Sequence, residues 1–187
     1  MELSGAEIII KLLENQGIKV VAGIPGGSNL PIYSALHKSS IRHILARHEQ
    51  GAGFICHGIA RTTGRASVCF ATSGPGVTNL LTAIADAKLD SIPIVAITGQ
   101  VPYEAMGTDS FQEVDTYGLT VPITKHNFLV RSAKELLDVI PKAFKIAEEG
   151  RPGPVVVDVP KDVQNEKIEF KLSENIDNTA KKNNLDI

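Results

Sequence analysis

Hydrophobic positions follow two alternating periods along this chain, one typical of helices and one of short strands. Residues 4–16 carry apolar side chains at helical spacing, with Ser4 and Glu7 in a capping-box pattern and Gly17 at the expected helix end. Ser28 is expected to cap a second helix, and Gly64 is expected to end the helix that starts at Glu49. Apolar periodicity predicts helices over residues 28–38, 49–63, 76–88 and 132–149, and strands over residues 19–22, 41–45, 67–71, 93–98, 154–159 and within 123–130.

The order of these elements predicts the architecture. Strands that alternate with helices form a parallel sheet covered on both faces, and the unbroken valine run at residues 155–157 is typical of a strand buried on both sides. We therefore expect an α/β fold with three layers, αβα, around a central, mostly parallel sheet. Residues 99–118 have no steady period, and irregular stretches of that length are often functional.

Composition sets the class of protein and the extent of the domain. The 187 residues are 43% hydrophobic and 21% charged, as in an ordinary globular domain. We expect that domain to cover residues 1–165, with a polar linker or disordered tail over residues 166–187. A net charge of −2 without a basic stripe argues against nucleic acid, and the longest apolar runs have strand length, which argues against a membrane span.

The beginning of the chain and its cysteines indicate a compartment. The first residues lack the basic and then apolar pattern of a signal peptide. Cys56 and Cys69 lie in apolar surroundings and are interpreted as packed free thiols, as in a reducing environment. We expect a cytoplasmic protein.

Several loops follow predicted strands directly, at the sheet edge where open α/β sheets bind ligands. Glu49 ends one strand and starts a helix; it is either a helix-capping charge or a functional carboxylate. The turn at residues 74–76 is either an ordinary tight turn or a close approach of backbone to a ligand. His43 and His48 are interpreted as solvated or capping residues. Dinucleotide and phosphate-loop fingerprints, metal-ligand spacing and a nucleophile elbow are all missing from the sequence.

A set of short motifs occurs in one order: GIPGG at 23–27, RHEQ at 47–50, SGPGVTN at 73–79, DSIP at 90–93, TGQVP at 98–102, GTDSFQE at 107–113 and GRPGPV at 150–155. Together they resemble the N-terminal, pyrimidine-binding domain of acetolactate synthase (acetohydroxyacid synthase), a thiamine-diphosphate enzyme. The resemblance covers about residues 3 to 165. It implies the pyrimidine domain of the thiamine-diphosphate-binding fold.

The resemblance also implies roles for single residues. Glu49 would hydrogen-bond the N1′ atom of the aminopyrimidine and favour the imino tautomer that takes the proton from C2 of the thiazolium. The resulting carbanion attacks pyruvate, carbon dioxide leaves, and the hydroxyethyl unit adds to a second 2-keto acid. The implied cofactor-binding residues are Pro25, Gly26, Gly27, Glu49, Ser73, Gly74, Pro75, Gly76 and Asn79.

A second implied set lines the substrate channel: Ser28, Pro102, Phe111, Gln112 and Lys161. The family more often has alanine at the position of Ser28, so the resemblance does not fix the shape of the pocket there. Without the family, Phe111 reads equally as a core residue and Lys161 as a solvated charge. Phe111, Gln112 and Glu113 together resemble the biosynthetic, FAD-containing branch of the family.

The resemblance stops at the binding of the diphosphate. The Gly-Asp-Gly motif and its downstream asparagine, which carry Mg²⁺ in the family, are missing here. Mg²⁺ and FAD are thus expected through domains that this chain lacks, and none of its residues is expected to bind metal. We expect a fragment that is inactive alone, in a homodimer or homotetramer with the remaining domains of the large subunit and a possible small regulatory subunit, serving branched-chain amino acid biosynthesis.

Two other interpretations stay open. One is a stand-alone pyrimidine subunit of a split thiamine-dependent 2-keto-acid decarboxylase. The other is a non-catalytic interaction module that keeps the fold.

Overall fold

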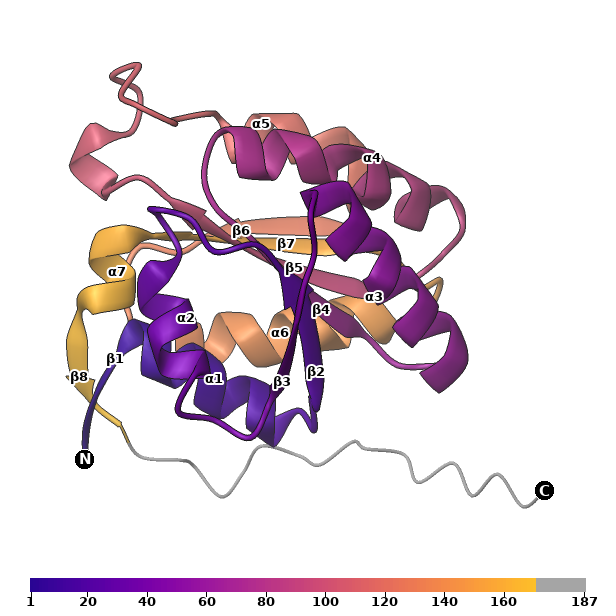
Figure 1. The fold of residues 1–187 in the computed structure, drawn as a ribbon, viewed down its shortest axis with the longest axis horizontal. Helices are drawn as coiled ribbons and strands as arrows, with labels where there is room; N and C mark the ends of the chain where they lie inside the picture. Colours follow the sequence, from indigo (N-terminus) through magenta and orange to yellow (C-terminus); the bar gives the residue numbers. More distant parts are fainter. Residues whose placement is uncertain (171–187) are drawn as a thin grey trace.

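A six-stranded sheet lies between two layers of helices in the computed structural model, which describes residues 1–170 (Figure 1). The strand order is β3-β2-β4-β5-β7-β6, and every neighbouring pair is parallel. This confirms the expected three-layer α/β fold. The strands are β2 (Val20–Gly23), β3 (Arg42–Leu45), β4 (Ser67–Ala71), β5 (Ile94–Gln100), β6 (His126–Leu129) and β7 (Val155–Pro160).

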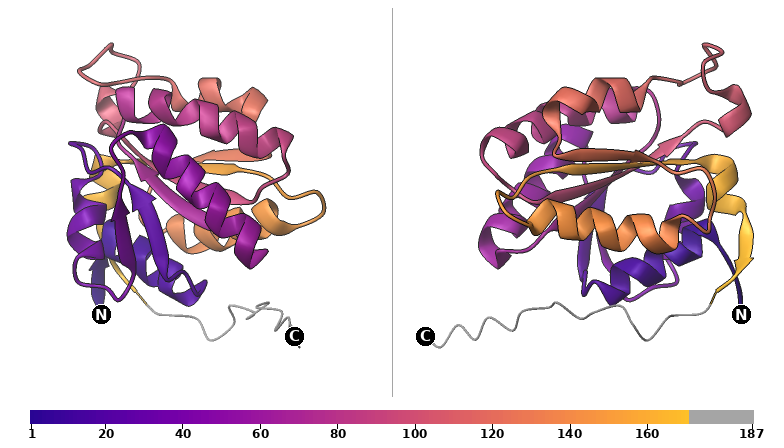
Figure 2. Two further views of the ribbon diagram at one scale, coloured as in Figure 1. Left: turned by 45° about the vertical axis from the view of Figure 1, so that its right-hand side comes forward. Right: turned by 180° about the vertical axis from the view of Figure 1, so that it is seen from behind.

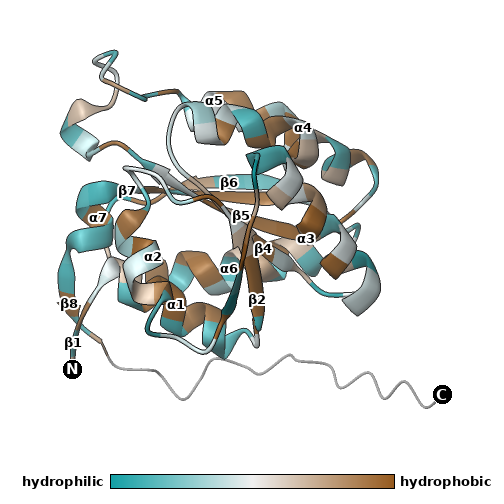
Figure 3. Cartoon of the chain, in the orientation of Figure 1, coloured by the Kyte–Doolittle hydropathy of each residue, from teal (hydrophilic) through white to brown (hydrophobic). Residues whose placement is uncertain are grey.

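The helices divide between the two faces of the sheet (Figure 2). One layer holds α1 (Gly5–Asn15), α2 (Leu30–Leu36) and α6 (Leu136–Glu148), and the other holds α3 (Glu49–Thr63), α4 (Pro75–Leu89) and α5 (Thr116–Thr120). Because side chains alternate along a strand, Phe70 packs into the first core while its neighbour Cys69 packs into the second. Each face of the sheet carries an apolar core, and the central strands are largely brown, the colour of hydrophobic residues (Figure 3).

Helix ends agree with the sequence signals in most places. Ser4 and Glu7 form the predicted capping box of α1, and Gly17 and Gly64 have positive φ after α1 and α3. The expectation for Ser28 is wrong. Helix α2 begins after Asn29, and the Ser28 hydroxyl bonds to the hydroxyl of Ser73 instead.

The end of the described chain belongs to the fold. Helix α7 (Lys161–Asn165) follows β7 directly, and strand β8 (Lys167–Glu169) pairs antiparallel with β1 (Glu2–Ser4). Phe170 is buried against the first core. The expected linker is therefore wrong for residues 166–170, because backbone pairing with the first strand holds them. The rest of that expected tail, residues 171–187, lies outside the described residues.

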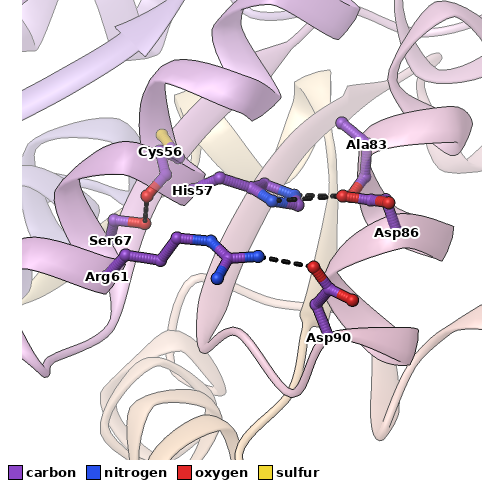
Figure 4. A network of polar contacts seen from close by, with 7 residues as sticks. All are labelled: Cys56, His57, Arg61, Ser67, Ala83, Asp86 and Asp90. Carbon is purple, nitrogen blue, oxygen red and sulfur yellow. Dashed lines mark hydrogen bonds and ion pairs between the residues drawn. The ribbon is translucent and has the colours of Figure 1, made fainter.

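Polar contacts brace α3 against α4 (Figure 4). The His57 ring nitrogen Nε2 donates to the carbonyl of Ala83 at 2.8 Å, and Arg61 pairs with Asp90 at 2.5 Å. Cys56 is one of two buried free thiols, as predicted, and its carbonyl accepts from Ser67. The bonds of His57 and Arg61 thus hold α3 against the α4 side of the layer, and the bond of Cys56 holds α3 against β4. Among residues 1–170, no helix is long and apolar enough to cross a membrane.

Candidate functional site

Glu49 is the first residue of α3, directly beyond the end of β3, and is only 8% exposed. The backbone turns into the helix at His48, whose Nδ1 accepts from the Gln50 amide at 3.2 Å. This confirms the interpretation of His48 as a capping residue, and it leaves the neighbouring carboxylate free of that task.

The Glu49 carboxylate points to the neighbouring helix α4. Asn79 donates from Nδ2 to Glu49 Oε2 at 3.0 Å. A β-carbon added at Gly76 would lie 3.6 Å from Oε1, so the first turn of α4 runs beside the carboxylate. No donor among residues 1–170 hydrogen-bonds Oε1. The contact with Asn79, from a different helix, favours the functional interpretation of Glu49 over the capping one.

The turn at residues 74–76 is shaped by close approach. Gly74 has a φ of 59°, and a β-carbon there would lie 2.6 Å from the carbonyl oxygen of Gln112. Gly76 approaches the side chain of Thr72 as closely, at 2.8 Å for the same virtual atom. Only glycine fits these two positions, which brings the β4–α4 turn against the long loop after β5.

Side-chain hydrogen bonds of Asn29 stabilise the loop between β2 and α2. Asn29 accepts from the Gly26 amide at 2.7 Å and donates to the carbonyl of Ile24 at 3.2 Å. Pro25 is exposed beside them. A β-carbon on Gly27 would meet nothing within 4 Å, so this residue faces open space. The loop is thus rigid and still leaves room for a ligand.

Ser28 joins the β2–α2 loop to the β4–α4 turn. Its hydroxyl lies 2.8 Å from that of Ser73, and its amide donates to Thr72 Oγ1 at 3.1 Å. The structure therefore brings together most of the residues that the resemblance assigns to cofactor binding: the β2–α2 loop, Glu49, the β4–α4 turn and Asn79.

The long stretch after β5 extends away from the sheet beyond the β4–α4 turn (Figure 1). It contains the short helices η1 (Tyr103–Ala105) and η2 (Val121–Ile123) on either side of α5. Pro102 is exposed and Phe111 is 87% exposed, which rules out the core interpretation of Phe111. The Glu113 carboxylate accepts from the backbone amides of Gly107, Thr108 and Ser110. These bonds, that of Gly107 first, hold the pKa of Glu113 below its usual value.

Lys161 lies at the start of α7 and is partly buried. It lines an open groove of about 460 Å³ together with Leu30, Lys38 and Lys167. No described contact connects its side chain to Glu49, so its expected place at a channel mouth stays a prediction.

Sequence reasoning missed a buried polar cluster at the carboxyl ends of β5 and β7. Asp158 is 2% exposed and accepts from the Thr98 hydroxyl at 2.5 Å and from the Gln100 amide at 3.0 Å. Gln100 also donates to the Val114 carbonyl, which anchors the far end of the long loop. Burial raises the pKa of Asp158 to about 6. An acidic residue inside a valine run gave no sign of this role in the sequence.

Glu49, Asn79 and Gly27 together suit a flat polar ring. Glu49 offers one carboxylate oxygen held by Asn79 and one beside a glycine, and Gly27 leaves space across the same edge. A carboxylate so placed can accept from, or share a proton with, a ring nitrogen. The described residues contain no group of three or more His, Cys, Asp or Glu that could hold a metal ion. The chemistry of the site thus fits the pyrimidine half of thiamine diphosphate.

Comparison with known proteins agrees with this geometry. Residues 3–119 match the family described as "Thiamine pyrophosphate enzyme, N-terminal TPP binding domain". The chain is 67% identical to the acetolactate synthase isozyme 1 large subunit of Escherichia coli over 162 residues, which is 86% of this chain and 29% of that protein. It is 53% identical to the acetolactate synthase large subunit of Corynebacterium glutamicum over 176 residues, 94% of this chain and 28% of that protein.

The similarity reaches the archaea, since a probable acetolactate synthase large subunit of Methanocaldococcus jannaschii is 53% identical over 169 residues, 90% of this chain and 29% of that protein. This chain spans less than a third of the length of each of these relatives. The family match covers well over half of the chain and contains Glu49, Asn79 and the β4–α4 turn. The chain therefore belongs to the thiamine pyrophosphate enzymes, as their N-terminal TPP-binding domain.

Proposed function

We propose that this chain is the pyrimidine-binding domain of an acetolactate synthase large subunit. The whole enzyme would decarboxylate pyruvate and join the hydroxyethyl unit to a second 2-keto acid, in branched-chain amino acid biosynthesis. Identities of 53–67% to proteins of that name support the proposal. The observation that carries it is the Glu49 carboxylate, buried at the start of α3 and oriented by Asn79 of α4.

Each part of the site has a task under this proposal. Glu49 Oε1 holds or moves a proton at the ring nitrogen N1′, while the Asn79 bond to Oε2 keeps the carboxylate turned toward the ring. The backbone of residues 25–27 and 73–76 would pack against the pyrimidine, and the open space beside Gly27 is available to the ring. Bound thiamine diphosphate supplies the electron sink for decarboxylation.

The remaining expectations belong to the same proposal. Ser28, Pro102, Phe111, Gln112 and Lys161 line the substrate channel, and the exposed ring of Phe111 is available to contact another domain or subunit. Mg²⁺ and FAD bind through domains outside this chain. The enzyme is a cytoplasmic homodimer or homotetramer, with a possible small regulatory subunit, and the chain by itself is inactive.

The proposal is tested by assembling an active enzyme. The chain alone, and the chain mixed with the separately expressed remaining domains of an acetolactate synthase large subunit, are assayed for acetolactate formation from pyruvate with thiamine diphosphate, Mg²⁺ and FAD. We expect activity only in the mixture. Glu49→Gln should lower kcat by at least about 100-fold, because an amide can hydrogen-bond N1′ but cannot exchange its proton. Glu2→Gln, at an exposed strand residue, serves as the matched control.

Three results would each overturn a different part of the proposal. Decarboxylation of a 2-keto acid without condensation, obtained with a separate diphosphate-binding subunit, would favour the split decarboxylase. A folded complex whose activity is unchanged by Glu49→Gln would mean that Glu49 takes no part in the reaction. A folded complex without any activity would favour a non-catalytic module.

A further inference from the structure

Gln164 is a fully buried side chain that lies far along the chain from the site. It belongs to α7, and its amide nitrogen donates to two carbonyl oxygens, that of Ser28 at 2.7 Å and that of Val159 at 2.8 Å. The bond to Ser28 joins residues 136 positions apart. Gln164 thus connects the last strand of the sheet to the loop between β2 and α2.

The orientation of this amide is determined by its partners. Carbonyl oxygens only accept hydrogen bonds, so the nitrogen must face them and the oxygen must point away. That oxygen, Gln164 Oε1, is buried without a hydrogen-bond partner among residues 1–170. A buried acceptor without a donor is unfavourable. The side chain therefore gains two donated hydrogen bonds at the cost of leaving its own oxygen unpaired.

The Ser28 carbonyl is also packed closely against strand β5. A β-carbon added at Gly99 of β5 would lie 2.1 Å from Ser28 O, which is far inside van der Waals contact. The Ser28 amide donates to Thr72, its hydroxyl bonds to that of Ser73, and its carbonyl accepts from Gln164. Every polar group of Ser28 therefore has a partner within the chain. The loop of residues 26–28 is therefore built as a rigid wall of the site.

We propose that Gln164 is a positioning residue for the site: its amide clamps the Ser28 carbonyl and so holds the backbone of residues 26–28 where the pyrimidine ring binds. The clamp itself depends only on the contacts above. Its consequence for ligand binding rests on the proposed function. Loss of the clamp frees Ser28 to move away from Gly99 and shifts the neighbouring backbone of Gly27.

The clamp is tested by amide hydrogen exchange, followed by NMR, on the whole chain. Gln164→Met keeps the length of the side chain and removes both donors. We expect the Ser28 and Asn29 amides to exchange at least about tenfold faster, with the amides of β4 and β5 unchanged. Asn165→Leu, on the exposed side of the same helix, should leave all of these rates unchanged.

Two further measurements do not depend on how well the Met variant folds. In the wild-type chain, the Gln164 side-chain amide protons should exchange far more slowly than those of an exposed glutamine, because both bonds are buried. Gly99→Ala pushes on the Ser28 carbonyl from the strand side, so it should shift the NMR signals of residues 26–29 and of the Gln164 amide together.

Unchanged exchange at Ser28 and Asn29 in Gln164→Met would overturn the clamp, as would equal acceleration of every amide or fast exchange of the wild-type Gln164 side chain. The ligand is tested separately, by titration with thiamine diphosphate and Mg²⁺ of the chain mixed with the separately expressed remaining domains. Under the proposed function, the wild-type mixture binds thiamine diphosphate, and Gln164→Met weakens that binding at least about threefold. A clamp confirmed by exchange, together with a folded wild-type mixture that does not bind thiamine diphosphate, would support the clamp and contradict the proposed function.

Discussion

Asp158→Asn should stabilise this domain at neutral pH, although it changes a fully buried, hydrogen-bonded side chain. Burial raises the pKa of Asp158 from the ordinary 3.8 to about 6. The folded state therefore binds more protons than the unfolded state between about pH 4 and pH 6, and the free energy of unfolding falls as the pH rises through that range. About two pKa units correspond to a cost of about 3 kcal/mol above pH 6.

Asparagine removes the charge and can keep both contacts. Its amide oxygen can accept from Gln100. Its amide nitrogen can donate to the Thr98 hydroxyl oxygen, in a bond of reversed direction that offsets part of the loss of the acceptor for the Thr98 proton. We expect the variant to be more stable than wild type by about 1–3 kcal/mol near pH 7.5, and equal or slightly less stable near pH 4.

The measurement is urea unfolding, followed by circular dichroism, of both proteins at several pH values. Other carboxyls also titrate in this range, but they are common to both proteins, so their contributions cancel in the difference. Asp158→Ala is the control. It leaves the Thr98 hydroxyl without its acceptor and removes one acceptor from the Gln100 amide, which keeps the Val114 carbonyl, and it should cost about 1–3 kcal/mol at every pH. A stability difference between wild type and Asp158→Asn that stays constant from pH 4 to pH 7.5 would refute the reasoning.

Three further predictions concern helix packing, capping and the long loop. Gly53→Ala should destabilise the domain by about 1–3 kcal/mol in urea unfolding, because its β-carbon would lie 2.4 Å from that of Ala83, whereas Gly58→Ala on the open side of α3 should stabilise it by about 0.5–1 kcal/mol. Ser4→Ala should cost about 1 kcal/mol in the same assay through loss of the α1 cap. Glu113→Gln should speed amide exchange in residues 107–113 with little change in global stability. Because the pKa of Glu113 is lowered, wild type should approach this behaviour only at a pH below the range in which an ordinary glutamate takes up its proton.

Each of these predictions has a result that contradicts it. Equal effects of the two glycine substitutions would mean that α3 and α4 do not meet at Gly53. A Ser4→Ala variant as stable as wild type would mean that the capping box does not stabilise α1. Slow exchange of the 107–113 amides in Glu113→Gln would show that the loop is held by something other than the carboxylate.

Local signals in the sequence determined the elements and the edge at which they meet. The capping box at Ser4 and Glu7 and the glycines after α1 and α3 identified helix ends correctly, because these depend on residues a few positions apart. The unbroken valine run identified a strand buried on both faces. The place of Glu49 between a strand and a helix followed from the same reading, and the carboxyl ends of parallel strands necessarily share an edge.

Contacts between distant parts of the chain were decided by the tertiary structure. Glu49 meets Asn79 because α3 and α4 pack at close glycine contacts, and no periodicity reports which side chains then face each other. Residues 166–170 are polar enough to resemble a linker, yet backbone pairing with β1, which is indifferent to side-chain polarity, makes them part of the fold.

Buried polar groups mark the limit of what could be read from the sequence alone. Asp158 and Gln164 are side chains usually found in water, and the expectation for each is exposure. Each is instead buried because partners 58 to 136 residues away complete its hydrogen bonds. Sequence pattern determined which residues form strands and helices. Only the folded chain, by bringing those partners together, decided which polar residues could leave water and hold the loops of the site in place.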